Sequence, residues 1–407
     1  MFRVGIAVVC VVASGAGSAA ADDATSVTFA DAVAAAQHAP ALVATQADIR
    51  AADARIDAAS AWPSPGVRVE TNRLTAKVVA GASVPLPVFG TVGAAQRVAA
   101  AEANVVRSDS VVADREVIRA AALAWIALAR AEGDAAAAAL SATQAKELET
   151  IAKGRLDTGA GAVVDVSTAS AARARADLAV IAANYERAAR GAELAGTLGW
   201  DARRTVTTAG ALPGNEAPAL GDLEHGLTTH PEHARAAHRI AVTEANAHEA
   251  RVSRFPTLAV EGAVAVDDPE TPGTDVMLGL SLDLPLFGRA GDRIRAANAT
   301  GDAERARMKA IDTQLAASLV AAEHRWQAAK ETEQQLETTI VPAQENVAKL
   351  ALTAYQEGAR DLETAIIAAR DLAAARAELV TARAELASAW VELLDAGGRD
   401  AAGRGQP

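Results

Sequence analysis

The sequence predicts a mostly α-helical chain with a small β part, built as a tandem repeat of one helix–β-hairpin–long helix–returning helix unit. Three observations lead to this fold class. An internal repeat relates the two halves, apolar residues alternate between proline-marked helix ends, and leucines recur every seven residues near the C-terminus. Self-similarity at a fixed spacing indicates a repeat architecture more firmly than any single motif does.

The N-terminal segment, residues 1–21, has the pattern of a secretory signal peptide. A basic start at Arg3 precedes an apolar run over Val4–Val12, and small residues lead to a cleavage site near Ala21. The single cysteine, Cys10, lies too early in this segment for a lipoprotein signal. We therefore expect an exported chain without lipidation, disulfides or thiol chemistry.

Composition narrows the class of function. The net charge of −12 argues against a nucleic-acid partner. After residue 21 no apolar stretch is long enough for a transmembrane helix, so a membrane role would have to come from strands. Aromatic residues make up only 3% of the chain. With so much alanine, the sequence favours long, closely packed helices over one thick core.

The internal repeat is visible in matching motifs. Residues 82–90 (ASVPLPVFG) match residues 280–288 (LSLDLPLFG) 198 positions later, and Gly159 matches Gly358 at an offset of 199. Upstream of these motifs the offset is smaller by about five, so the extra length of the second copy falls around 267–274. Insertions concentrate in loop tips, and this stretch is the strongest turn signal in the chain.

Both copies divide in the same way, at proline-marked breaks and glycine turns. The first repeat is predicted at 22–203, with a helix at 28–60, hairpin 66–86, long helix 90–156, tip 157–165 and a returning helix to 199. The second is predicted at 219–396, with a helix at 219–253, hairpin 257–285, long helix 288–355, tip 356–363 and a returning helix to 395. A linker at 204–218 joins them, and a flexible tail follows at 397–407. Each long helix would extend about 100 Å.

The returning helices carry coiled-coil signals. The second has a row of leucines seven residues apart and a companion row of alanines: Leu372, Leu379, Leu386 and Leu393, with Ala375, Ala382 and Ala389. This seam predicts left-handed packing with close helix approach. The first has a weaker seam, formed by Leu178 and Tyr185 in one row and by Ile181, Ala188 and Ala195 in the other.

The hairpins indicate a membrane role. Two apolar-alternating runs of about ten residues, starting at Leu258 and Val276, have the length that a tilted strand needs to cross a bilayer. The first hairpin is less convincing, because its strands look short and its turn near Arg73 tight. Four strands cannot close a barrel and an open edge is not tolerated in lipid. Spanning strands would therefore require a closed ring of subunits.

The chain resembles the TolC-like outer-membrane efflux protein family over about residues 27–396. The resemblance rests on the doubled architecture, the junction LPLFGRAGDRI at 284–294, and the glycine turns within 156–166 and 355–363. Within the family, the junction is closest to the CzcC-type heavy-metal branch. The resemblance implies a homotrimer in the bacterial outer membrane. A twelve-stranded transmembrane β-barrel would cap an α-barrel tunnel that extends into the periplasm.

The resemblance also implies a function. The chain would be the passive exit duct of a tripartite efflux system for metal ions or small toxic compounds. A periplasmic adaptor (membrane fusion) protein would couple it to an inner-membrane pump of the RND type, and the tip would open like an iris. Two alternatives remain: the exit duct of a type I protein secretion system, and a soluble periplasmic coiled-coil scaffold. No catalytic motif is present, so neither an enzyme nor a cofactor is predicted.

The candidate functional residues lie at the tips and junctions. A ring of like charges could select cations or form a gate; the candidates are Asp157, Asp165, Arg360 and Asp361. Asp165 has a second interpretation as a helix cap, and Thr364 stands where other members often carry aspartate. The resemblance implies adaptor contact at Gly159, Gly161 and Gly358. The strand-to-helix junctions are Pro87, Phe89, Gly90, Pro285, Phe287 and Gly288.

Five histidines cluster in one helical region, at His225, His230, His233, His238 and His248. Metal ligands on one helix face need a spacing of three or four residues. Only His230 and His233 have it, and they straddle a helix start at Pro231. The sequence therefore predicts no metal site.

Overall fold

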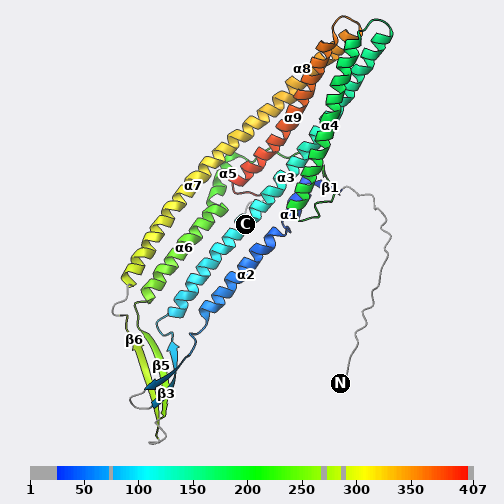
Figure 1. The fold of residues 1–407 in the computed structure, drawn as a ribbon. Helices are drawn as coiled ribbons and strands as arrows, with labels where there is room; N and C mark the ends of the chain where they lie inside the picture. Colours follow the sequence, from blue (N-terminus) through cyan, green and yellow to red (C-terminus); the bar gives the residue numbers. More distant parts are fainter. Residues whose placement is uncertain (1–24, 73–76, 267–272, 286–289, 402–407) are drawn as a thin grey trace, which may run out of the picture.

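The computed structural model describes residues 25–72, 77–266, 273–285 and 290–401. The predicted signal peptide lies outside these residues, as do most of both hairpin turns, Phe287 and Gly288. Long helices run side by side, with a small sheet at one end and two helix-hairpin tips at the other (Figure 1). The prediction of a mostly helical chain with a small β part is confirmed.

The first half of the chain contains most of one repeat. Its elements are β1 (Thr25–Thr28), α1 (Phe29–Ala36), α2 (Ala41–Ser60), β2 (Gly66–Asn72), β3 (Lys77–Leu86), α3 (Thr91–Asp157) and α4 (Val163–Thr197). At ten residues, β3 is longer than the sequence suggested. The 67 residues of α3 form one uninterrupted helix.

The second half follows the same order. Its elements are β4 (Val206–Ala209), α5 (Leu220–Gly226), a 3-10 turn (Leu227–Thr229), α6 (Pro231–Val252), β5 (Thr257–Val266), β6 (Thr274–Asp283), α7 (Ala290–Gln335), a π-helical turn (Leu336–Ile340), α8 (Val341–Gln356) and α9 (Leu362–Ala396). No helix in the described part of the chain combines the length and apolar character needed to cross a bilayer.

Four predicted boundaries differ from the structure. The helix expected at 28–60 is interrupted before Pro40, which has no N–H to donate, and the one expected at 219–253 is interrupted before Pro231. The expected linker contains β4, which pairs in parallel with β1. The expected flexible tail begins as packed structure, since Ala401 is only 7% exposed and the Arg399 carbonyl accepts a hydrogen bond from Arg115.

Capping side chains explain where two helices begin. Thr28 starts α1 with a capping box, in which its hydroxyl accepts from the Asp31 N–H while the Asp31 carboxylate accepts from the Thr28 N–H. His230 starts α6 by accepting from the Glu232 N–H, with Pro231 in the first helical position. Both caps use short-range signals that are visible in the sequence.

The repeat is also visible in how each returning helix ends. Gly199 ends the α4 segment with a φ of +73° and lies so close to Pro40 that an added Cβ would overlap the proline ring. Gly398, 199 positions later, ends the α9 segment with a φ of +76°, and an added Cβ would lie 3.4 Å from His230 Cδ2. Each repeat thus closes its returning helix against its own first helix.

The largest core cluster lies midway along the helices, where the two repeats meet. Trp125 of α3 is fully buried, and its indole N–H donates to the Val27 carbonyl of β1 at 2.8 Å. Phe29 packs edge-on against Trp125 with ring centroids 5.5 Å apart. Val391 of α9 joins the same cluster, so this core holds the N-terminal strand, the longest helix and the last helix together.

The two predicted coiled-coil seams have different outcomes. In α9, Leu372, Leu386 and Leu393 are buried, as are the companion alanines. In α4 the predicted seam is only partly buried within the single chain, because Ala195 is fully buried while Leu178 is 65% exposed, Ile181 54% and Tyr185 76%. The helix instead buries small residues such as Ala169 and Gly191, which allow a close approach to its neighbours.

We predict that Gly199→Ala lowers the apparent melting temperature of the purified protein more than Gly210→Ala does. Both glycines have positive φ, which costs a side-chain-bearing residue about 1–2 kcal/mol. Only Gly199 also lacks space for a Cβ, because Pro40 occupies it. Circular dichroism at 222 nm during heating measures the difference, and equal losses would contradict the packing role of Gly199.

Candidate functional site

The four-stranded antiparallel sheet, in the order β2–β3–β5–β6, has two chemically distinct faces. Directly paired residues share a face and successive residues alternate, so the register sorts every strand position. Val69 pairs with Ala80, Ala80 with Val264, and Val264 with Val276, which defines an apolar row across all four strands.

One face carries no charge at all. Its members are Val67, Val69, Thr71, Val78, Ala80, Ala82, Val84, Leu86, Leu258, Val260, Gly262, Val264, Val266, Thr274, Val276, Leu278, Leu280 and Leu282. These side chains are not covered within the chain, since Leu278 is 85% exposed and Leu280 is 72% exposed. The other face carries the charged strand residues whose side chains are described, Arg68, Glu70, Glu261 and Asp283. Such a sheet needs an apolar environment on one side only.

The strand-to-helix junctions join the sheet to the helices with aromatic residues. Phe89, which follows β3, stacks on Phe255, which precedes β5, with ring centroids 5.7 Å apart. Gly90 forms the N-cap of α3 with a φ of +77°, a conformation that glycine adopts at little cost. Pro87 follows β3 as a half-buried residue outside regular structure, and Pro285 follows β6 as an exposed one. The predicted partners Phe287 and Gly288 lie outside the described residues.

The two tips are built alike around glycine turns. Gly159 and Gly358 have φ of +75° and +78°, and the residue after each donates its N–H to a carbonyl five positions back. This hydrogen bond closes the end of the preceding helix. At Gly161 an added Cβ would lie 2.9 Å from the backbone nitrogen of Leu156, so this glycine is required by space.

The four predicted charged tip residues have different environments. Asp361 is the N-cap of α9 and accepts hydrogen bonds from the Thr364 hydroxyl and N–H, which lower the pKa of its carboxyl. Asp165 lies half-buried in the first turn of α4 without being its cap, because Ala162 holds that position. Asp157 ends α3, and both it and Arg360 are exposed.

A residue that sequence reasoning missed, Arg155, links the two tips. Its guanidinium donates to the carbonyls of Tyr355 and Gln356 at the end of α8 and to the Ala160 carbonyl of its own tip. It also lies 5.0 Å from the centre of the Tyr355 ring. The absence of a Cβ at Gly358 leaves room for it, since a Cβ there would be 3.3 Å from both terminal nitrogens. Arginine near a helix C-terminus is the only sequence signal of this role.

Tyr355 is the most buried large side chain near the tips, at 1% exposure. Burial is the main cause of its raised pKa, and the charge of Asp165 adds to it. Its hydroxyl and the Nε atom of Arg155 have no hydrogen-bond partner among the described residues. The tips therefore enclose two polar groups that are unsatisfied in the single chain.

Behind the first tip lies a charged cluster that joins α3 to α4. Glu149 of α3 is only 7% exposed as a side chain and accepts from Lys153 at 2.7 Å and from Arg173 of α4 at 2.9 Å. The hydrogen bonds from these two cations lower the pKa of Glu149 to about 2. The cluster fixes the returning helix at a point close to the tip.

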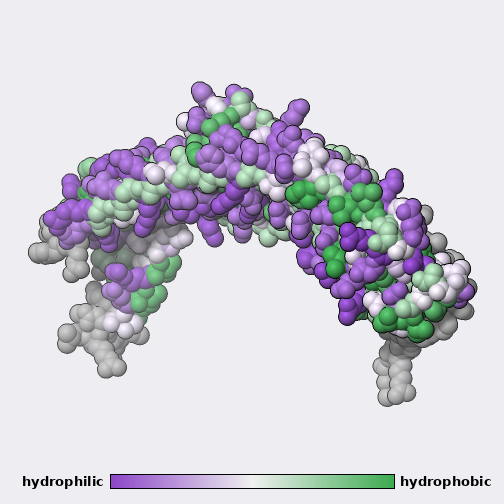
Figure 2. Space-filling view, turned by 90° about the horizontal axis from the view of Figure 1, so that it is seen from above, coloured by the Kyte–Doolittle hydropathy of each residue, from purple (hydrophilic) through white to green (hydrophobic). Residues whose placement is uncertain are grey.

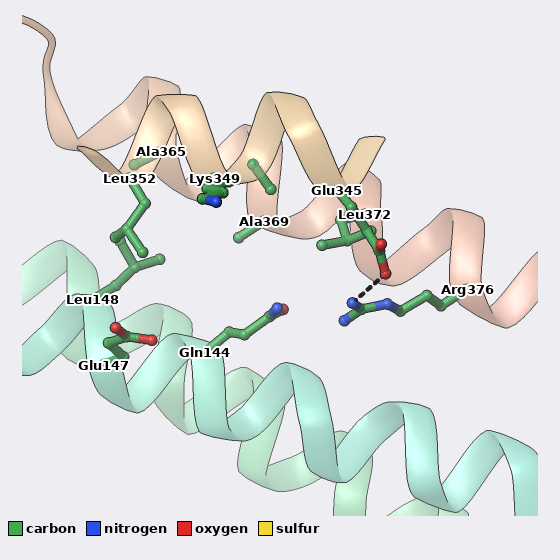
Figure 3. A pocket seen from close by; sticks show the side chains of 11 residues that line it. Gln144, Glu147, Leu148, Glu345, Lys349, Leu352, Ala365, Ala369, Leu372 and Arg376 are labelled. Atoms are coloured by element: carbon green, nitrogen blue, oxygen red, sulfur yellow. Dashed lines mark hydrogen bonds and ion pairs between the residues drawn. The ribbon is translucent and has the colours of Figure 1, made fainter. Parts of the chain in front are cut away.

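A cavity of about 310 Å³ separates α3 from α8 and α9 near the tips. Figure 3 shows Gln144 pointing into it from α3, opposite an ion pair of 2.7 Å between Glu345 and Arg376. The amide oxygen of Gln144 is buried without a hydrogen-bond partner in the described part of the chain. The lining mixes these polar groups with Leu352 and Leu372.

Three of the five clustered histidines have separate contacts. His233 pairs with Asp312 at 2.7 Å, and His230 is buried with a lowered pKa, mainly because burial disfavours its charged form. His248 contacts Arg97 at 2.9 Å. No group of three possible metal ligands occurs within residues 25–72, 77–266, 273–285 and 290–401.

We predict that Arg155→Lys loosens the connection between the tips. Lysine keeps the charge but lacks the planar fork that reaches several carbonyls at once. Amide hydrogen exchange over residues 352–362 should accelerate by about tenfold or more, as expected when charged hydrogen bonds are lost. Arg187→Lys, at an exposed site on α4, serves as the control. Unchanged exchange in the Arg155 variant would contradict the link.

We also predict that Glu149 contributes to stability against acid. Its folded pKa is lowered from 4.5 to about 2, so the contribution is fully present above pH 4.5 and is lost as the pH falls toward 2. Glu149→Gln should therefore lower the melting temperature at pH 6. At pH 3 the difference in melting temperature between the variant and wild type should be smaller. Glu147→Gln, at an exposed neighbouring position, should show no such pH dependence.

Comparison with known proteins identifies the architecture. A sequence model of the outer membrane efflux protein family matches residues 225–399. No curated protein matches the chain in sequence.

Solved structures share the fold over nearly the whole chain. A membrane protein from Pseudomonas aeruginosa is 18% identical, with a TM-score of 0.77 over 91% of this chain and 90% of that one. VceC, an outer membrane protein of Vibrio cholerae, is 17% identical, with a TM-score of 0.73 over 91% and 96%. The open state of the MtrE outer membrane channel of Neisseria gonorrhoeae is 16% identical, with a TM-score of 0.72 over 91% and 89%. Residues 225–399 thus match the outer membrane efflux protein family in sequence, and the chain as a whole has the fold of these solved outer membrane channels, as the resemblance to TolC-like channels predicted.

Proposed function

We propose that the chain is the outer-membrane channel subunit of a tripartite efflux system and acts as a homotrimeric, passive exit duct. The observation that carries this proposal is the sheet with one uncharged, exposed face and two unpaired edges. Its strands β3, β5 and β6 have ten residues each, the length that a tilted strand needs to cross a bilayer. The bacterial outer membrane is the setting in which such strands occur.

The edges of the sheet supply the argument for a ring. β2 and β6 end the sheet on either side, and backbone groups at an open edge cannot remain unpaired in lipid. The edge β6 of one copy would pair with β2 of the next. With the three copies expected of the family, twelve strands would close a barrel, with the apolar face toward lipid and Arg68, Glu70 and Glu261 toward the bore.

The helical part offers a second reason for neighbours. The exposed row Leu178, Ile181 and Tyr185 lies on α4, while Val347 and Leu350 are exposed on α8. These two surfaces differ, so contact between them is head-to-tail and closes into a ring when the rotation allows. Repetition of the curved helical layer in Figure 2 would form the wall of a periplasmic tunnel.

The tips would face the other components of the system. Gly159, Gly161 and Gly358 form narrow turns on which a periplasmic adaptor could dock, and the adaptor would connect the duct to an RND-type inner-membrane pump. Asp157, Asp165 and Arg360 remain candidates for a charged ring at the entrance. Asp361 would contribute less to this charged ring, because its carboxylate accepts the hydrogen bonds that cap α9.

The cargo would be what the pump delivers, metal ions or small toxic compounds. The exit duct of a type I secretion system would have the same geometry, and no contact of this chain favours it. A soluble scaffold would leave the uncharged face of the sheet in water at a large hydrophobic cost, which makes it the weaker alternative.

We predict that Leu278→Lys abolishes assembly in the outer membrane, whereas Met277→Lys allows it. The two residues are neighbours on β6 but lie on opposite faces, Leu278 opposite Gly262 and Met277 opposite Ala263. A lysine facing lipid at mid-membrane costs about 2–4 kcal/mol per site, and a ring would multiply the cost. Membrane fractionation and gel mobility of unheated samples measure assembly, and equal behaviour of the two variants would overturn the proposed barrel.

We predict that Tyr185→Glu weakens the ring in detergent while leaving the secondary structure intact. The side chain is 76% exposed in the single chain, so the substitution disturbs little within one copy. Arg187→Glu, two positions away on another face of α4, is the control. Mass determination by light scattering should show fewer assembled rings for the Tyr185 variant only, and intact rings would exclude this row from the interface.

A further inference from the structure

The apolar face of the sheet ends in a row of leucines beside the helices. Leu86 pairs with Leu258, and Leu258 pairs with Leu282. Beyond this row the strands connect to α2, α3, α6 and α7, whose ends lie next to the sheet (Figure 1). In the proposed channel the leucine row marks the periplasmic limit of the hydrocarbon layer. The connections and helix ends therefore lie at the level of the lipid head groups.

The helix ends next to the sheet are basic, although the whole chain carries a net charge of −12. The segments 87–97, 248–256 and 290–295 contain five arginines and two acidic residues, a net charge of +3. We call the arginines, all of them exposed, the arginine collar: Arg97, Arg251, Arg254, Arg293 and Arg295. Because α6 packs against both α3 and α7, the collar brings together cations from three helix ends.

Most of the collar has no counter-charge within the described part of the chain. Arg97 contacts the His248 ring at 2.9 Å, and Arg295 pairs with Asp292. The other three form no side-chain hydrogen bond or ion pair with any described residue: Arg251, Arg254 and Arg293. An exposed guanidinium presents its N–H donors in a planar fork that fits two oxygens of a phosphate group.

Helix capping accounts for only part of the collar. Arg251 lies in the last turn of α6, where a cation stabilises the negative end of the helix dipole. Arg293 is the fourth residue of α7, near the positive end of its dipole, where a cation is unfavourable. The adjacent carboxylate, Asp292, is already paired with Arg295. The position of Arg293 therefore favours an anion from outside the chain.

Aromatic side chains lie beside the arginines. Trp62, between α2 and β2, is 66% exposed, and the stacked Phe89 and Phe255 are exposed as well. Tryptophan is enriched at the boundary between lipid and water, where its ring lies among the head groups. The long apolar stem of arginine can cover acyl chains while its guanidinium reaches the head groups. Aromatic and basic residues together fit a lipid surface, whereas a soluble anion would leave the aromatic rings in water.

We propose that the arginine collar binds the phosphate groups of anionic phospholipids on the periplasmic surface of the outer membrane. The proposal rests on the proposed function, in which the sheet spans that membrane. Arg251, Arg254 and Arg293 would contact the phosphates, and the aromatic rings would lie between head groups and acyl chains. In a closed ring each copy would contribute its own collar, so bound anionic lipid would surround the base of the barrel and fix its depth.

Brominated phospholipids test the collar in the reconstituted full-length protein, because bromine on an acyl chain quenches nearby tryptophan fluorescence. Trp62 lies next to the sheet, and Trp62→Phe measures the background from the tryptophans far from the sheet: Trp125, Trp200, Trp326 and Trp390. Quenching by brominated phosphatidylglycerol and by brominated phosphatidylcholine gives the relative affinity for the anionic lipid. We expect wild type to prefer phosphatidylglycerol by about fivefold or more, the factor that one basic residue contributes near an anionic surface.

A triple variant removes the unpaired cations. Arg251→Gln, Arg254→Gln and Arg293→Gln together should bring the preference close to one. The control removes the same charge from exposed positions on α4 and α9 and should keep the wild-type preference: Arg175→Gln, Arg187→Gln and Arg370→Gln. High salt should weaken the preference of wild type, because it screens exposed charges. An unchanged preference in the triple variant would contradict the collar.

The wild-type measurement is decisive even if the triple variant misfolds. Equal quenching by the two lipids, or no quenching of Trp62 by either, would overturn the collar. Glycerol phosphate that abolishes the preference from solution would show that the arginines bind a soluble anion instead.

Flotation of the same vesicles separates the collar from the proposed function. Wild-type protein that floats with neither kind of vesicle would overturn the duct, and the collar with it. Protein that floats with both kinds and resists extraction at alkaline pH, but prefers neither lipid, would overturn the collar alone. We expect flotation with both kinds of vesicle, and the preference for phosphatidylglycerol only where the collar is intact.

Discussion

The continuous helix α3 is the element on which the rest of the structure depends. It packs against α2, α4, α6 and α9, and so touches helices of both repeats. Two of its arginines, about 60 Å apart along the helix axis, bind the C-terminal ends of helices in the second repeat. Arg115 donates to the Asp395 carbonyl in the last turn of α9 and to the Arg399 carbonyl beyond it, and Arg155 donates to the last carbonyls of α8. Carbonyls at the helix ends of the second repeat, which lack a hydrogen-bond partner within their own helix, are thus satisfied by side chains of the first repeat.

The sheet imposes a second constraint, because it is shared between the repeats. β3 of the first copy pairs with β5 of the second from Val78–Val266 to Leu86–Leu258. A shift of one residue would turn every apolar side chain of a strand to the charged face. The stacked Phe89 and Phe255 lie where this pairing ends and the helices begin. The same pairing therefore fixes both the chemistry of the sheet and the start of the long helices.

The two repeats share this helical frame but differ in their returning helices and in their second long helix. α4 leaves Leu178, Ile181 and Tyr185 outside and buries Leu194 together with alanine and glycine, whereas α9 buries all of its leucines except the half-buried Leu379. One returning helix therefore has a surface for a neighbour, and the other supports the interior of the same chain. The π-helical turn before α8 is a second difference, and it borders a groove although its first residue, Leu336, is buried. The two repeats therefore share one frame, and the departures from symmetry leave an exposed apolar surface on α4.

The sequence by itself determined what short-range patterns encode: the repeat, the glycine turns at Gly159 and Gly358, the leucine seam of α9 and the alternation of β5 and β6. Periodicity, glycine and proline act through the local backbone, so their effects can be predicted from the sequence without knowledge of tertiary contacts. Only the tertiary structure decided which face of α4 is buried, that β1 pairs with β4, and that Arg155 joins the tips. These features depend on residues up to about 200 positions apart, and nothing in the local pattern specifies which distant group a side chain will meet.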